Sequence, residues 1–176
     1  MGGVETQQRL EPMVAAAMGA SLSVTLHFIR LFRLPQGGSV TLASALPVWI
    51  VARRFGFKAG LACGATTGLL LAMLEARPVH WLQPITDYPL AYGVLGLAAM
   101  TSSPIRGALL STAARFAIHV ASGVAFFSSF APPGTSPLMF SLAYNASYVL
   151  PDLILALCLL VALQTRAPHL LVKSPS

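Results

Sequence analysis

Residues 138–163 read LMFSLAYNASYVLPDLILALCLLVAL, and this stretch decides the fold class. Asp152 is the only charged residue within it. The run is longer than the ~20 predominantly apolar residues that a helix needs to cross the hydrocarbon core of a bilayer. The stretch therefore predicts a transmembrane helix.

The composition of the whole chain supports the same class. Of 176 residues, 56% are hydrophobic and 9% are charged, and the mean hydropathy is +0.74. Soluble domains carry about 25% charged residues, and one of this size has too little interior to bury so much apolar surface. The net charge is +6, but Lys and Arg stand at the ends of apolar runs, which is typical of membrane topology signals. This distribution argues against nucleic-acid binding.

We therefore predict an all-α integral membrane protein, with one membrane domain over residues 1–176 built as a bundle of six transmembrane helices. The apolar runs and the polar segments between them place these helices at 13–29, 39–52, 59–74, 85–100, 105–127 and 138–163. The first run has no small-residue cleavage signal after it, so we interpret it as a retained helix and not as a signal peptide.

The basic residues predict the orientation. One side of the membrane receives seven of them, and the other side three. The first set is Arg9, Arg53, Arg54, Lys58, Arg106, Arg166 and Lys173, and the second is Arg30, Arg33 and Arg77. Because cytoplasmic loops carry the excess of Lys and Arg, both termini are predicted to be cytoplasmic. The loops on the outer side contain the Gly- and Pro-rich segments from which a binding site would draw.

Sequence motifs for catalysis and metal binding are missing. The chain has no GxSxG, HExxH or GxxxxGK[ST] motif, which are the sequence signatures of serine hydrolases, zinc proteases and ATPases. Cys63 and Cys158 lie in apolar runs without ligand spacing. We expect no enzyme activity, no cofactor and no metal site.

Polar residues inside the helices indicate where a site could lie, because such residues are costly in a membrane. His119 and Asn145 are each about two turns from the outer ends of their helices. With Asp87, Tyr88, Phe127 and Phe140 above them, they could form a pocket for a flat, cationic heteroaromatic ligand. Equally, His119 and Asn145 could be polar contacts between helices with no ligand.

A second pair of polar residues lies deeper in the membrane, by the same count of helical turns from the outer side. Arg115 and Asp152 are each about four turns from the outer side, on helices joined by a short loop. We predict a structural ion pair between them. Alternatively, Arg115 extends to the cytoplasmic surface and Asp152 faces a water-filled gap.

The first helix carries small residues four apart, which allows another helix to approach closely. These are Ala15, Ala16, Gly19 and Ala20. We predict that this face docks a partner protein.

Four stretches carry a resemblance to one known family. They are PQGGSVTLASALP with RRFGFKAG after it, DYPLAYGVLGLA, ARFAIHVASGVAFF, and PPGTSPLMFSLAYNASYVLPD. They resemble the thiamine-specific substrate-binding subunits of energy-coupling factor (ECF) transporters. The first stretch resembles that family's first outer loop and second helix, the second its fourth helix, and the last two its fifth and sixth helices with the loop between them. The segments occur in the family's order, from about Leu10 to Leu163.

The resemblance implies a subunit that binds thiamine with high affinity from outside and works with a membrane-coupling subunit and two ATPases. It implies that Asp87 and Tyr88 bind the ligand, that His119 lies beside the thiazolium ring, and that Asn145 lies near the pyrimidine. Phe127 stands where some members have a stacking Trp, and Phe140 where some have Tyr. Some members also have a Trp in the first outer loop, where this chain has glycines. The small-residue face of the first helix matches the family's docking face.

The predicted location is the plasma membrane of a prokaryote, in contact with lipid. Two other hypotheses about function stay open. One is a membrane scaffold whose polar layers are purely structural, and the other is a related subunit for another vitamin.

Overall fold

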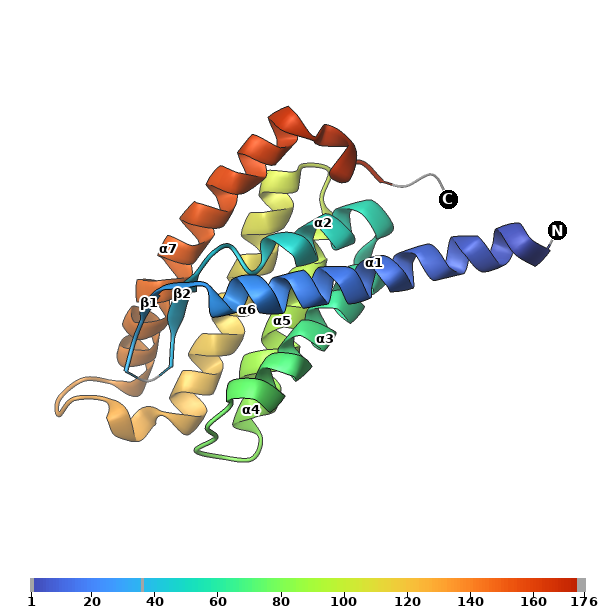
Figure 1. Cartoon of the computed structure of the whole chain (residues 1–176). Coiled ribbons are helices and arrows are strands. Elements are labelled where there is room, and N and C mark those ends of the chain that lie inside the picture. Colours follow the sequence, from blue (N-terminus) through green and yellow to red (C-terminus); the bar gives the residue numbers. More distant parts are fainter. Residues whose placement is uncertain (1, 36, 174–176) are drawn as a thin grey trace.

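The computed structural model describes residues 2–35 and 37–173, which form a helical bundle with a small β-hairpin at one end (Figure 1). The helices and strands are α1 (Gly2–Phe28), β1 (Arg30–Arg33), β2 (Ser39–Thr41), α2 (Leu46–Phe55), α3 (Phe57–Glu75), α4 (Gln83–Ile85), the π-helix η1 (Thr86–Leu90), α5 (Ala91–Gly93), the 3₁₀ segments η2 (Val94–Met100), η3 (Ser128–Phe130) and η4 (Pro168–Leu170), and the long helices α6 (Pro104–Phe126) and α7 (Pro137–Arg166).

The elements from α4 to η2 follow one another without a break and together make one irregular helix, here called the composite helix. It packs against α3 with direct backbone contact. A Cβ added at Gly60 would lie 2.9 Å from the Gly96 Cα, and one at Gly68 would meet the Tyr88 carbonyl. Gly64 lies between them and meets Tyr92 in the same way. Glycines spaced four apart on α3 thus let the two backbones approach closely.

Helix α1 packs against α2 and α3 through the small residues of the predicted docking face. Ala16, Gly19 and Ala20 are buried, and Ala15 is partly buried. A Cβ at Gly19 would lie 2.8 Å from Val51 Cγ2 and 3.0 Å from Cys63 Sγ. The close approach that these three residues allow is therefore used inside the chain, and the docking of a partner on this face stays a prediction.

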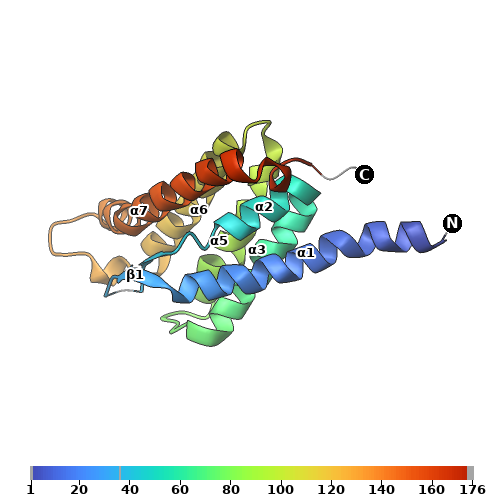
Figure 2. The same cartoon turned by 45° about the horizontal axis from the view of Figure 1, so that its top comes forward.

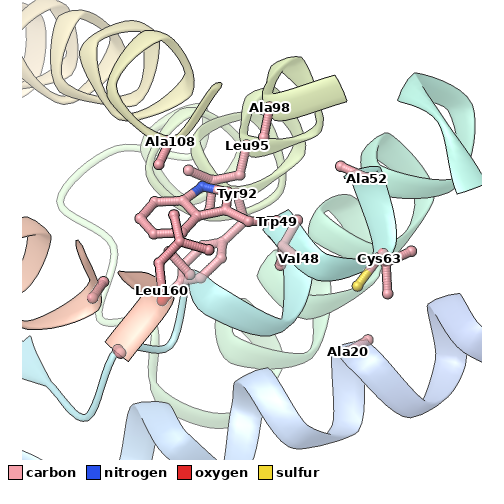
Figure 3. Close-up of a cluster of buried hydrophobic side chains, with 14 of the residues drawn as sticks. Ala20, Val48, Trp49, Ala52, Cys63, Tyr92, Leu95, Ala98, Ala108 and Leu160 are labelled. Carbon is pink, nitrogen blue, oxygen red and sulfur yellow. The ribbon is translucent and has the colours of Figure 1, made fainter. Parts of the chain in front are cut away.

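The centre of the bundle is a cluster of buried side chains around Trp49 and Tyr92 (Figure 3). Leu95, Ala108 and Leu160 pack around these rings from the composite helix, α6 and α7. Because α2 supplies Trp49, this short helix is anchored in the middle of the bundle. The C-terminal segment is held at the same helix, where Arg54 Nη1 donates to the His169 carbonyl at 2.8 Å.

The hairpin corrects two details of the prediction. Its strands pair antiparallel, with Arg30 opposite Thr41 and Arg33 opposite Ser39, so the chain is not purely α-helical. Strand β2 occupies 39–41, and α2 begins at Leu46, not at residue 39. The run from Ser39 is apolar enough for a helix, but Val and Thr pair readily as strands, and here they find a partner in β1.

Within residues 2–35 and 37–173, three helices are long and apolar enough to cross a membrane, namely α3, α6 and α7. By contrast, α2 rises only ~15 Å at 1.5 Å per residue, about half of a hydrocarbon core. Large apolar side chains such as Leu69, Met73, Leu150 and Ile154 are exposed on the bundle, as a lipid-facing surface requires. Both views show α1 lying along one side and its N-terminal end projecting beyond the other helices (Figures 1 and 2).

Candidate functional site

A cavity lies between the hairpin, the composite helix, α6 and α7, and it also reaches the C-terminal ends of α1 and α3. All six residues that the sequence predicted as ligand-binding line it. They are Asp87, Tyr88, His119, Phe127, Phe140 and Asn145. Segments that are far apart in the chain therefore meet at one site.

Asp87 occupies one wall of the cavity through an unusual local backbone. Pro89 has no N–H to donate, and the chain around it forms the π-helix 86–90 inside the composite helix. Such π-helical turns change the direction of side chains and are frequent at functional sites. Here the turn contains Asp87 and Tyr88, and both line the cavity.

The Asp87 carboxylate has two hydrogen-bonding neighbours. Gln83 Nε2 donates to Oδ2 at 2.7 Å, and His119 Nδ1 lies 3.4 Å from Oδ1. Arg115 Nε lies 3.3 Å from His119 Nε2 and can only donate, so this ring nitrogen must accept. The proton of a neutral His119 is then on Nδ1 and points to Asp87.

Another wall of the cavity is aromatic, and most of it is built by α7. Phe140 and Tyr144 stack with their ring centroids 6.1 Å apart, and Tyr148 meets Tyr144 edge-on at 5.8 Å. Phe127, at the end of α6, completes the aromatic lining. Spacings of four residues place these α7 rings on one side of the helix.

Asn145 is buried and held by its neighbours. Its Nδ2 donates to the Ser141 carbonyl at 2.9 Å, and its Oδ1 accepts from the Tyr148 hydroxyl at 2.6 Å. The amide therefore has a fixed orientation before any ligand arrives, which favours selective hydrogen bonding.

Several residues of the cavity were not predicted from the sequence. His27 Nε2 donates to Glu75 Oε1 at 2.6 Å, and Arg30 also pairs with Glu75. The other His27 nitrogen, Nδ1, lies 2.9 Å from the Tyr92 hydroxyl. Glu75 stands at the C-terminal end of α3, where the only other charged residue is Lys58 in the first turn. An acidic residue at the end of a long apolar run is a sequence signal for a paired or functional group.

The predicted ion pair between Arg115 and Asp152 is not formed. Instead, the Arg115 guanidinium lies over the Tyr92 ring, 4.3 Å from its centroid. Asp152 Oδ1 accepts hydrogen bonds from both the N–H and the hydroxyl of Thr41, each at 2.8 Å. Both side chains line the cavity. Each binds a residue outside α6 and α7, and the prediction had compared positions along these two helices only.

Both acidic and basic side chains surround the cavity. Glu75, Asp87 and Asp152 line it, against Arg115 and the Arg30 that pairs with Glu75. In the described part of the chain, no Lys or Arg lies within ion-pair distance of Asp87. The Asp87 carboxylate is therefore open to pairing with a cationic group of a ligand.

Comparison with known proteins agrees with this geometry. The family described as "Thiamine transporter protein (Thia_YuaJ)" matches residues 13–172. The thiamine transporter ThiT of Bacillus subtilis is 33% identical over 93% of this chain and 95% of its own length. The ThiT of Lacticaseibacillus paracasei is 27% identical over 72% of this chain and 74% of its own.

A solved structure has the same fold. ThiT from Listeria monocytogenes superimposes with a TM-score of 0.85, at 22% identity, over 93% of this chain and 98% of that one. The family consists of transporters and not of enzymes. This chain belongs to the thiamine transporter family.

Proposed function

We propose that this protein is the substrate-binding subunit of an ECF-type vitamin transporter, and that it binds thiamine with high affinity in the cavity between the hairpin, the composite helix, α6 and α7. The observation that carries the proposal is the convergence of Asp87, Tyr88, His119, Phe127, Phe140 and Asn145 on this one cavity. If these residues served only as contacts between helices, they would not all need to line the same cavity.

The chemistry of thiamine suits these walls. Its thiazolium ring is a permanent cation, and its aminopyrimidine is flat and carries hydrogen-bonding groups. Among the described residues, Asp87 has no Lys or Arg partner, and aromatic faces attract cations. We assign His119 and Phe127 to the thiazolium ring, and Asn145 and Phe140 to the pyrimidine, with Tyr88 beside the acidic group.

We place the protein in the plasma membrane with both termini in the cytoplasm, following the excess of Lys and Arg on that side. The α2–α3 turn and the N-terminus of α6 would then face inward, and the hairpin and the 127–136 loop outward. Delivery across the membrane would need a membrane-coupling subunit and two ATPases. Single cysteines near Arg54 and Arg106 should react with an impermeant thiol reagent only from the cytoplasm, and those near His80 and Gly134 only from outside. The reverse pattern would place the cavity entrance on the wrong side.

Titration of the purified protein tests the proposal directly. We expect calorimetry to show one thiamine site per chain, and thermal unfolding to shift upward, since a ligand at 100 times its Kd stabilises the folded state by about 2.7 kcal/mol. Riboflavin and biotin are the control ligands. Stabilisation by one of them, but not by thiamine, would identify a subunit for another vitamin. No response to any of the three would favour a scaffold.

A further inference from the structure

Strand β2 is attached to α7 at three successive points. The Gly38 N–H, just before β2, donates to the Tyr144 hydroxyl at 2.9 Å. Val40 packs with Tyr148 in a small buried cluster. The N–H and hydroxyl of Thr41 both donate to Asp152 Oδ1. The α7 residues follow one another at intervals of four, so a single stripe of the helix holds the whole strand.

Of the three contacts, the one at Thr41 involves a buried carboxylate, that of Asp152. Asp152 is 9% exposed, lies in the middle of α7 and has no Lys or Arg within ion-pair distance in the described part of the chain. A buried carboxylate is costly unless its oxygens are hydrogen-bonded. Both bonds come from Thr41, so the strand and the carboxylate depend on each other.

The held strand forms part of the cavity wall. Gly38, Ser39 and Thr41 line the cavity, and so do Tyr144 and Tyr148. A Cβ at Gly38 would lie 2.5 Å from Tyr148 Cδ1 and 3.0 Å from the Tyr144 hydroxyl, so the strand backbone rests directly on the two rings. A movement of β2 away from α7 would open this wall and uncover the tyrosines.

We infer that Asp152 is a positioning residue for ligand binding. It acts as the hydrogen-bond acceptor that fixes β2 against α7, and through β2 it sets the wall formed with Tyr144 and Tyr148. The effect on thiamine rests on the proposed function, whereas the effect on the strand does not. The role differs from that of a charge paired with Arg115, because it needs an acceptor oxygen and not a negative charge.

Thiol labelling measures the position of the strand without a ligand. In a background where Cys63 and Cys158 are replaced by Ala, Ser39→Cys places a reporter on β2. Ser111→Cys, at a fully buried position on α6, is the matched control for loosening of the whole bundle. We expect Asp152→Ala to raise the labelling rate of the Ser39→Cys reporter at least tenfold and to leave that of the Ser111→Cys reporter within twofold.

Conservative variants separate the acceptor from the charge. Asp152→Asn keeps an acceptor oxygen, so its Ser39→Cys labelling should stay within threefold of the parent protein. Thr41→Ser should also resemble the parent, and Thr41→Val, which removes only the hydroxyl, should label faster. If Asp152→Ala does not fold, this Thr41 pair decides the question. Equal labelling of Thr41→Val and Thr41→Ser would then overturn the inference.

Three other results would overturn it as well. They are an unchanged Ser39→Cys rate in Asp152→Ala, an equal rise at Ser111→Cys, and an Asp152→Asn variant that behaves like Asp152→Ala. In the binding arm, thiamine should dissociate at least tenfold faster from Asp152→Ala and within threefold of the parent rate from Asp152→Asn. A parent protein that binds no thiamine would refute the proposed function alone, because the labelling results remain interpretable.

Discussion

Replacing Asp87 by Asn removes one negative charge from the cavity and one of the two hydrogen-bond acceptor oxygens. The Asn side chain has the same shape, and its oxygen can still accept from Gln83 or from His119, although not from both. One of the two contacts is therefore lost, and folding should be largely preserved. Any large change in thiamine affinity then reports the interaction between the carboxylate and the ligand.

The size of the effect follows from Coulomb's law. A cationic ring about 5 Å from the carboxylate, at an effective dielectric constant of about 20, interacts with about 3 kcal/mol. The Asp87 side chain is 17% exposed, and solvent near the entrance reduces this figure. Hydrogen bonds to charged groups contribute about 1.5–3 kcal/mol. We therefore expect a loss of about 2 kcal/mol, which is ~30-fold in Kd.

Isothermal titration calorimetry with two ligands measures this electrostatic contribution of Asp87 to the binding free energy. Thiamine should lose ~30-fold in affinity for Asp87→Asn, whereas an analogue with an uncharged thiophene in place of the thiazolium should lose less than about threefold. Glu11→Gln is the matched control, because it removes a carboxylate from an exposed position of α1 outside the cavity. Equal losses for the charged and the uncharged ligand would refute the electrostatic reasoning.

Two further predictions concern packing and hydrogen bonding. Gly19→Ala should destabilise the isolated subunit by about 1–3 kcal/mol in thermal unfolding, because the new methyl group would press on Val51. The exposed Ala17→Val should change little, and an unaffected Gly19→Ala would mean that α1 is free to separate from the bundle. Tyr148→Phe should weaken thiamine binding by about 1–2 kcal/mol, because Asn145 Oδ1 loses the hydroxyl that orients it, and unchanged calorimetric affinity would show that the orientation does not matter.

The sequence predicted the membrane class and the last two long helices closely, whereas α1 runs over Gly2–Phe28 and not over 13–29. The expected ranges 105–127 and 138–163 correspond to Pro104–Phe126 and Pro137–Arg166. These features follow from apolar runs and from Pro and Ser at helix starts, which are properties of neighbouring residues. Spacing on α6 and α7, together with the family resemblance, also selected six residues that converge on one cavity.

Other contacts in the site join residues from different elements, and the spacing of residues along a single helix could not predict them. The hairpin brought Thr41 to Asp152, so the carboxylate had a nearer partner than Arg115. The sequence contained Gly60, Gly64 and Gly68 at intervals of four, and this signal for close packing against the composite helix could have been read in advance.

Apolarity along the chain determined by itself that this protein lies in a membrane and where its long helices run, because the free energy of transfer to lipid is a sum over local residues. Only the tertiary structure decided which partner each special residue takes. Small residues on α1 permitted a close approach, and the fold used it for α2 and α3. Asp152 required hydrogen-bond donors, and a strand more than a hundred residues earlier supplied them. Such choices depend on the rotation and distance of elements that are remote in sequence, which no local pattern contains.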